Sequence, residues 1–272
     1  LDGGNAAYPR MLSAIDGAQQ SVHLEVYIFE NHGVGTRFMD ALSAAAARGI
    51  SVAVVLDGWG SARSGRAVAS ALRRAGCKVQ IHNRLWALFA GRFGRNHRKL
   101  LLVDDEVAFL GGINIDNVNV TNAERMASAD LALEIRGPQC ASLGQLVRGE
   151  TRRLVASSLR IHLCGPGGGW RLRRRYIRAF AQARSDIYLA HGYFLPDAGV
   201  IRALVSASRR GTRIHLLLAG QANHLLVRAA TRSLYRQLLA AGVVIHERQG
   251  SLMHAKVAIV DCELLLIGSF NL

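Results

Sequence analysis

Two histidines, each followed two positions later by a lysine, are the most reactive arrangement in this sequence. His97 and Lys99 lie in HRKLLLVDD, and His254 and Lys256 lie in HAKVAIVDC. An imidazole can attack phosphorus or transfer a proton, and an ammonium group can neutralise a phosphoryl oxygen. Two such pairs at one centre would suit cleavage of a phosphodiester. Neither a metal nor a cofactor is required, because the lysines supply the positive charge.

The two copies share more than this spacing. An offset of 157 residues relates both histidines and both lysines, and it extends to three further pairs of identical residues. These pairs are Asp104 and Asp261, Gly111 and Gly268, and Asn114 and Asn271. We expect both asparagines to return on the next strand and to donate amide hydrogen bonds to the same phosphate. Identity at a fixed offset indicates an internal duplication.

The nearby carboxylates divide into two groups by expected role. Asp104 and Asp261 lie at predicted turns, an odd number of residues from the motif histidines, so we assign them to structural stability rather than to chemistry. An attacking imidazole needs an acceptor on its second ring nitrogen. Asp130, in SADLALEIRGP, is the candidate to orient His97. We therefore assign the attack to His97 and protonation of the leaving oxygen to His254, whose own carboxylate partner we expect beyond the present C-terminus.

The remaining sequence predicts the elements that position these residues. Strand and helix patterns alternate over residues 21–82 and again over 185–247, each time before a copy of the motif. We expect an α/β fold of two pseudo-symmetric α/β/α lobes with mixed, mostly parallel sheets and an active site at the lobe interface. Each histidine should share a strand face with its lysine, since residues two apart in a strand point the same way.

A boundary between the lobes is predicted in CGPGGGWRLRRR, residues 164–175, after a helix over about 138–158. Glycine and proline at this density interrupt regular structure. We place the N-terminal lobe at 1–160 and the C-terminal lobe at 161–272. The chain starts at Leu1 without methionine and stops directly after the second motif, so we expect the natural protein to extend further.

The composition favours anionic partners. Lysine and arginine outnumber aspartate and glutamate by 34 to 19, giving a formal net charge of +15. Such a surface attracts nucleic acid, anionic lipid headgroups or phosphorylated substrates, or it only keeps the protein soluble. Four scattered cysteines indicate free thiols in a reducing compartment. No apolar run reaches the roughly 18–20 residues of a membrane span, and we recognise no signal peptide.

The duplicated motif resembles the phospholipase D superfamily, whose signature is H-x-K-x4-D followed by G-x-x-N. The copies read HRKLLLVD with GGIN and HAKVAIVD with GSFN. Nearly the whole chain is similar to bacterial cardiolipin synthases, for example in EVYIFENHGVGTRFMDALSAAAARGISVAVVLDGWGS and YFLPDAGVIRALVSASRRGTRIHLLLAG. The resemblance implies transfer of a phosphatidyl group to the glycerol headgroup of phosphatidylglycerol through a phosphohistidine. It also implies a peripheral position on the cytoplasmic side of the bacterial inner membrane.

Two departures from the superfamily pattern concern the first half of the chain. Gly112 stands where many members carry serine, which Ser269 retains in the second copy. ASAD precedes the strand that follows Asp130, where many members carry Trp-Arg-Asp or a related polar sequence. The carboxylate itself is kept, so the predicted hydrogen bond to His97 stands.

Two basic segments are candidates for contact with a membrane. NRLWALFAGRFGRNHRK, residues 83–99, mixes apolar rings with cations, which suits either an interfacial contact or packing between the lobes. Its relevant members are Arg84, Trp86, Leu88, Phe89, Arg92, Phe93, Arg95 and Arg98. The second segment begins a predicted helix and is either a solvated face or a contact with anionic lipid. It contains Arg171, Arg173, Arg174, Arg175 and Arg178.

Three functions are open at this point. A phosphatidyltransferase of the cardiolipin synthase type is favoured. A phospholipase D-family enzyme that hydrolyses phospholipid or cleaves nucleic acid would use the same four groups, but an aromatic content of 6% indicates no platform for stacked bases. A catalytically silent lipid-binding or scaffold protein is disfavoured, because both His-x-Lys pairs are intact.

Overall fold

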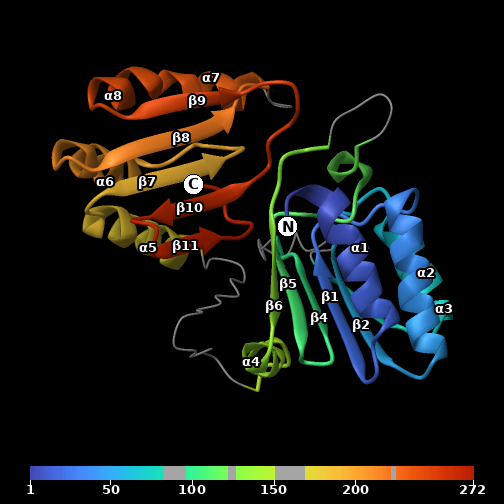
Figure 1. Ribbon diagram of the computed structural model, residues 1–272. Helices are drawn as coiled ribbons and strands as arrows, with labels where there is room; N and C mark the ends of the chain where they lie inside the picture. The colour runs from blue at the N-terminus through green and yellow to red at the C-terminus, as the bar shows by residue number, and fades with distance from the viewer. Residues whose placement is uncertain (83–95, 122–126, 151–168, 222–224) are drawn as a thin grey trace, which may run out of the picture. The chain divides into compact units, whose positions relative to one another are not determined.

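The computed structural model describes most of the chain as two compact units (Figure 1). The described residues are 1–82, 96–121, 127–150, 169–221 and 225–272. The first unit comprises 1–120 and 132–167, and the second comprises 121–131 and 168–272. Asp130 therefore belongs to the second unit. Most of the predicted segment 83–99 and the first part of the predicted linker 164–175 lie outside the described residues.

The first unit is built on a six-stranded sheet in the order β3-β2-β1-β4-β5-β6. Its strands are β1 (Ser21–Val26), β2 (Ser51–Asp57), β3 (Lys78–His82), β4 (Leu100–Val103), β5 (Val107–Gly111) and β6 (Ala132–Arg136). β1, β2 and β3 are parallel because helices connect them. β4, β5 and β6 continue the sheet with antiparallel pairing, which short connections allow.

Helices cover both faces of this sheet. They are α1 (Gly3–Asp16), α2 (Val34–Ala47), α3 (Gly65–Arg74) and α4 (Pro138–Val147), and the short 3-10 helix η2 (Asn117–Asn119) precedes β6. Leu101 and Val103 of β4 pack in the core that α1, α2 and α3 complete, whereas Leu100 and Leu102 pack with α4. This alternation is what a period of two requires.

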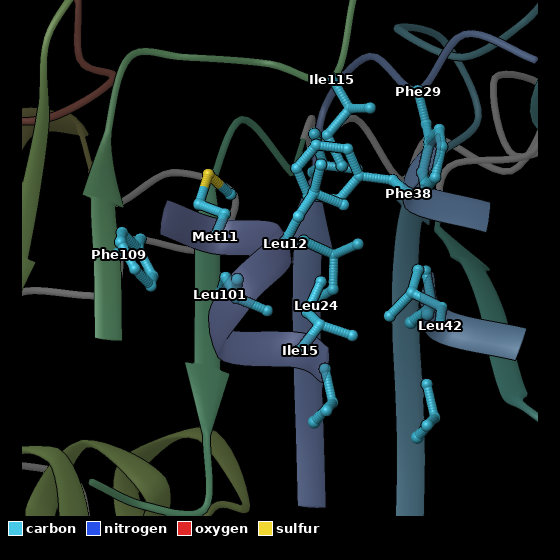
Figure 2. Packing of buried hydrophobic residues seen from close by; sticks show 14 of the residues in the cluster. Met11, Leu12, Ile15, Leu24, Phe29, Phe38, Leu42, Leu101, Phe109 and Ile115 are labelled. Atoms are coloured by element: carbon cyan, nitrogen blue, oxygen red, sulfur yellow. The ribbon is translucent and has the colours of Figure 1, made fainter. Parts of the chain in front are cut away.

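The core under α1 is formed by its apolar stripe. Met11, Leu12 and Ile15 are all buried and belong to the same cluster as Leu24 of β1 and Leu101 of β4. Figure 2 shows these side chains between the helix and the strands. Spacings of three and four residues put the helical members on one side of α1, so the helix is held by packing along its length.

The second unit repeats the plan on a five-stranded sheet in the order β11-β10-β7-β8-β9. Its strands are β7 (Asp186–His191), β8 (Arg213–Ala219), β9 (Val244–Arg248), β10 (Lys256–Val260) and β11 (Leu264–Ile267). Its helices are α5 (Gly169–Gln182), α6 (Ala198–Arg209), α7 (Leu225–Ser233) and α8 (Tyr235–Ala240). Two consecutive helices, α7 and α8, precede β9 and meet at Leu234.

The strand registers prove the repeat. Glu25 of β1 lies opposite Leu100, and Ala190 of β7 lies opposite Val257, which follows Leu100 by the motif offset of 157. β1 and β7 are therefore equivalent, with an offset of 165 residues between Glu25 and Ala190.

The fold class is confirmed as α/β with two mixed sheets, but parallel pairing does not predominate. Among the described strands four pairings are parallel and five are antiparallel. The reason is the motif itself, which forms a hairpin in each unit. No described helix combines the length and apolar character needed to cross a bilayer.

Candidate active site

Both His-x-Lys segments lie at the start of a strand rather than within it. β4 begins at Leu100, and β10 begins at Lys256. The expected strand position is therefore wrong for His97, Lys99 and His254. The physical reason is the length of the ladder: pairing of β4 with β1 stops at Leu100, and pairing of β10 with β7 stops at Lys256. The histidines thus lie at the end of the sheet, in the segment of chain that leads into β4 or β10.

The first half-site consists of Tyr27, His97 and Lys99. Lys99 Nζ lies 3.2 Å from His97 Nδ1 and donates a hydrogen bond to the His97 carbonyl oxygen at 3.0 Å. The ring centroids of Tyr27 and His97 are 4.4 Å apart, and the ammonium group lies 5.1 Å from the tyrosine ring. Only 6% of Lys99 is exposed. The tyrosine face therefore helps to hold a cation that has little solvent around it.

The second half-site consists of Asp130, Tyr193, His254 and Lys256. His254 Nδ1 lies 2.7 Å from Asp130 Oδ2, and Lys256 donates to the His254 carbonyl oxygen. The Tyr193 ring lies 6.0 Å from the His254 ring and 5.9 Å from the Lys256 ammonium group. Both half-sites thus pair a histidine and a lysine with one tyrosine. Neither tyrosine was predicted as a site residue, although each lies in a segment that the sequence predicts as a strand; Tyr27 directly follows β1 and Tyr193 lies two residues after β7.

Burial changes the pKa of the lysine in the second half-site. Lys256 is 1% exposed, and Asp130 is also 1% exposed. Burial lowers the pKa of Lys256 to about 8, and the Asp130 charge opposes part of that decrease. The ammonium form therefore still predominates at neutral pH, but it is held less firmly than in a solvated lysine.

The structure corrects the predicted partner of Asp130. We expected this carboxylate to orient His97 and expected the partner of His254 beyond the present C-terminus, but Asp130 bonds to His254. The backbone explains the pairing: Ala129 forms a parallel bridge with Met253, and its carbonyl oxygen accepts the His254 N–H at 2.8 Å. Asp130 therefore does not favour His97 over His254 as the attacking residue.

Two buried carboxylates, Glu25 and Asp57, hold the residues on either side of His97, and we call them the carboxylate clamp. Asp57 Oδ2 accepts the backbone N–H of Asn96 at 2.8 Å, and Glu25 Oε2 accepts its side-chain amide at 3.0 Å. Arg98 Nη1 lies 3.4 Å from Glu25 Oε2. Glu25 is 4% exposed and Asp57 is fully buried. The clamp therefore fixes the backbone that carries His97.

Glu25 is ionised in this setting. Burial raises its pKa, but hydrogen bonds from His23 and Asn96 and the charge of Arg98 outweigh burial and lower the pKa to about 2. The clamp was not predicted from the sequence. Its available signals were a glutamate inside an apolar strand and an aspartate at the carboxyl end of a buried strand, where α/β proteins often place functional groups.

Asp104 and Asp261 lie in the hairpin turns after β4 and β10, at the opposite end of each strand from its histidine. Asp104 has a φ of 53° and Asp261 a φ of 55°, and the residue after each is also left-handed, as type I′ hairpin turns require. Each carboxylate accepts backbone N–H groups from the residues that lead into β1 or β7, including the first residue of the strand. The donors are Gln19, Gln20 and Ser21 for Asp104, and Arg184, Ser185 and Asp186 for Asp261.

These bonds favour the ionised form of both aspartates. The N–H groups of Ser185, Asp186 and Arg184 lower the pKa of Asp261 to about 2. For Asp104, burial raises the pKa, but the corresponding backbone bonds lower it on balance. The geometry supports a structural role.

The two predicted phosphate-binding asparagines differ in their surroundings. Asn114 is 4% exposed, and its Oδ1 accepts the backbone N–H of Ile28 at 3.2 Å. Its carbonyl oxygen accepts the Tyr8 hydroxyl at 2.6 Å. The amide Nδ2 is therefore the group with which Asn114 could donate to a phosphate. Asn271 is exposed. Contact of either side chain with phosphate stays a prediction.

Comparisons with known proteins agree with the motif. The family described as "Cardiolipin synthase, PLD-like domain" matches residues 11–141 and 176–272. Cardiolipin synthase B of Salmonella typhimurium is 32% identical over 298 aligned positions, which cover 100% of this chain and 71% of that protein. Cardiolipin synthase 1 of Staphylococcus aureus is 27% identical, with 99% of this chain and 59% of that protein covered.

Two solved structures share the fold. Phosphatidylserine synthase of Haemophilus influenzae has a TM-score of 0.68 at 13% identity and covers 96% of this chain and 75% of its own. Polyphosphate kinase of Porphyromonas gingivalis has a TM-score of 0.61 at 16% identity, over 98% of this chain and 44% of its own. At such identities the likeness concerns architecture alone.

Proposed function

Because this chain belongs to the cardiolipin synthase family of phospholipase D-like proteins, we propose that it is a phosphatidyltransferase of the cardiolipin synthase type. It transfers a phosphatidyl group to the glycerol headgroup of phosphatidylglycerol. The observation that carries the proposal is the duplicated half-site, in which each histidine lies beside a nearly buried lysine. Two histidine–lysine pairs suit one phosphodiester, because a phosphate diester carries one negative charge and two non-bridging oxygens that the lysines can contact.

In the proposed reaction both half-sites act on one phosphorus. Lys99 and Lys256 neutralise the non-bridging oxygens, and Asn114 and Asn271 donate amide hydrogen bonds to them. One motif imidazole attacks, forming the P–N bond of a phosphohistidine. The P–O bond to the leaving alcohol breaks, and the other imidazole protonates the departing oxygen.

The second step reverses these roles on a new alcohol. The imidazole that has given up its proton removes one from a glycerol hydroxyl of phosphatidylglycerol. The resulting oxygen attacks phosphorus, the P–N bond breaks, and the electron pair returns to the histidine ring. Cardiolipin leaves with the phosphatidyl group, and both histidines are restored to their starting protonation states.

Asp130 serves this cycle by fixing the His254 ring. A carboxylate can only accept, so Nδ1 of His254 carries the proton in their 2.7 Å contact. Nε2 is then the nitrogen available to phosphorus or to the proton of an alcohol. The carboxylate also stabilises the imidazolium form that arises when His254 takes up a proton.

The substrate places the enzyme at a membrane. Both lipids of the proposed reaction have their phosphates at the bilayer surface, so the protein reaches them from the water side. We therefore propose a peripheral position on the cytoplasmic side of the bacterial inner membrane, with basic and aromatic surface in contact with anionic phospholipid.

The test supplies lipid and nucleic acid in parallel. The protein is incubated with phosphatidylglycerol vesicles, with and without phosphatidylethanolamine, and separately with single-stranded DNA, and the products are identified by mass spectrometry. Cardiolipin is the expected product, and a variant with both motif histidines replaced by asparagine should form none. Phosphatidic acid without cardiolipin would indicate hydrolysis, and shortened DNA without lipid products would indicate a nuclease. Either outcome would contradict the proposal.

A further inference from the structure

Helix α5 of the second unit carries an exposed basic face. Arg171, Arg174, Arg175 and Arg178 are all exposed, and Trp170 at the start of the helix is 53% exposed. Spacings of three and four residues put these side chains along one side of the helix. We call these five residues the arginine face.

The opposite side of α5 explains how the helix is held. Tyr176, Ala179 and Phe180 are buried in the core of the second unit, together with strand residues such as Ile187 and Leu189. The packing that stabilises α5 therefore uses none of the five residues of the arginine face.

The cations of this face have no acidic partner among the described residues. In the part of the chain that the structure describes, none of the four guanidinium groups forms an ion pair with a carboxylate. Elsewhere such pairs are common, as for Arg213 with Asp186 and Arg232 with Glu247. The sequence of α5 contains no acidic residue. Within the described ranges the positive charge of this exposed face is therefore uncompensated.

The exposed tryptophan is held by the same cations. The Arg171 guanidinium lies 5.4 Å from the Trp170 ring centroid, and that of Arg174 lies 5.7 Å from it. Cation–π contact orders these side chains relative to one another. An exposed indole between guanidinium groups presents an apolar ring and positive charge at the same spot.

The first unit shows that the fold does not need this face. α1 is the equivalent of α5, because Arg48 and Arg210 donate to carbonyl groups near the ends of the two helices, and these acceptors are related by the same offset of 165 that relates β1 to β7. The acceptors are Ile15 and Asp16 in α1, and Phe180 and Ala181 in α5.

At this offset the arginine face of α5 corresponds to a nearly neutral surface on α1. The equivalents are Asn5, Ala6, Pro9, Arg10 and Ser13. Arg10 is the basic residue among them, and it is paired with Glu134. The same helix is thus built with and without a cationic surface, which indicates that the surface serves a partner rather than the core.

We propose that the arginine face docks the protein on an anionic lipid bilayer, an inference that rests on the proposed function because its substrate lies in such a bilayer. Guanidinium groups bind phosphate oxygens in a bidentate manner, which suits a layer of phospholipid headgroups. Tryptophan is favoured at the level of the headgroups, where its ring meets both water and acyl chains. Single-stranded nucleic acid would instead need successive aromatic platforms, and Trp170 is the exposed aromatic residue of α5.

The test compares two triple variants that lose the same charge. Arg171→Gln, Arg174→Gln and Arg178→Gln are combined in one, and the exposed first-unit arginines Arg37, Arg63 and Arg66 are changed to glutamine in the other. Each is sedimented with vesicles of phosphatidylglycerol and phosphatidylcholine, and with phosphatidylcholine alone. We expect the first triple to bind the anionic vesicles about 10- to 100-fold more weakly than wild type. The control should change by less than about threefold, since scattered charges act through a screened field.

A second readout separates docking from catalysis. On short-chain phosphatidylglycerol dissolved as monomers, the α5 triple variant should keep the wild-type rate, whereas on vesicles its rate should fall together with binding. If the wild-type protein forms no cardiolipin, the proposed function is rejected. The comparison of vesicle binding between the two variants would still test the docking surface. Wild-type vesicle binding by the α5 variant, or an equal loss in the control, would overturn the inference. The same variants are also tested for binding to single-stranded DNA. A loss confined to DNA binding would overturn the inference as well, because it would assign the face to nucleic acid.

Discussion

The two half-sites reach the same pairing of histidine, lysine and tyrosine by different means. In the first, the carboxylate clamp holds the residues before and after His97. In the second, Asp130 bonds to the ring of His254 itself. The strand registers and the motif offset identify what replaces the clamp network. The equivalents of Glu25, Asp57, Asn96 and Arg98 are Ala190, Ala219, Met253 and Ala255.

The difference shows that duplication has preserved the reactive groups while their supports have diverged. Met253 and Ala255 are buried apolar residues, and backbone hydrogen bonds from His254 and Ala255 to Ala129 hold the second segment, whereas buried charge holds the first. The clamp acts on the backbone beside His97, whereas Asp130 acts on the orientation and tautomer of an imidazole. Substitutions in the two half-sites should therefore change different kinetic properties.

The largest expected effect comes from the histidines. His97→Asn and His254→Asn should each lower turnover by about a thousandfold or more, because each removes a bond-forming or proton-transferring group. Turnover is measured on phosphatidylglycerol, and circular dichroism checks that the variants fold. A near-normal rate in either variant would remove that half-site from the chemistry.

The second-largest loss of activity should come from removing the Asp130 carboxylate that holds the His254 ring. Asp130→Asn keeps the size of the side chain but presents an amide to His254, which permits the wrong tautomer, so we expect a drop in kcat of about a hundredfold. The pH dependence of kcat should shift as well, since the imidazolium loses its counter-charge. An unchanged pH profile would argue that Asp130 is structural.

Weakening the clamp should cost less. Glu25→Gln keeps a hydrogen-bond acceptor for Asn96 but removes the charge that attracts Arg98, so we expect about a tenfold loss of turnover from imperfect positioning of His97. Glu134→Gln is the matched control, because Glu134 lies on the same sheet and pairs with Arg10 and Arg136 away from the motif. Equal losses in both variants would point to general destabilisation.

The smallest expected effect is a pH dependence that comes from Lys256. Burial lowers the pKa of Lys256 to about 8, so the ammonium form needed for phosphate is present below that pH and lost above it. In wild type, kcat/KM should fall to about half of its plateau near pH 8. Lys256→Arg should move this limb to higher pH, because a guanidinium keeps its proton there. The same limb in both proteins would assign the titration to another group.

The sequence predicted the parts of the site that depend on short spacing. The His-x-Lys pairs and the turns at Asp104 and Asp261 are local patterns, and the repeat made them recognisable. Asp130 was found as a candidate, but its partner was missed because His254 is 124 residues away along the chain. Sequence proximity favoured His97, and the register of the bridge between Ala129 and Met253 cannot be read from spacing.

The clamp was missed for a similar reason. Asn96 is 71 residues from Glu25 and 39 from Asp57, and the three meet only because β1 and β2 are neighbours beside the motif segment. The alternation of strands and helices over residues 21–82 and 185–247 was predicted correctly from the periodicity. Whether neighbouring strands pair parallel or antiparallel was not predicted correctly, because it depends on the length of the connection and not on the alternation of side chains.

The aspartates of the two hairpin turns have a consequence for how the signature should be understood. Asp104 and Asp261 tie each hairpin to the loop before the first strand of its sheet, far along the strand from the reactive nitrogen. One short motif therefore contains residues for two separate tasks, one that stabilises the hairpin and one proposed to transfer a phosphoryl group. A descendant that exchanged its histidines but kept these aspartates would retain its architecture as a pseudoenzyme.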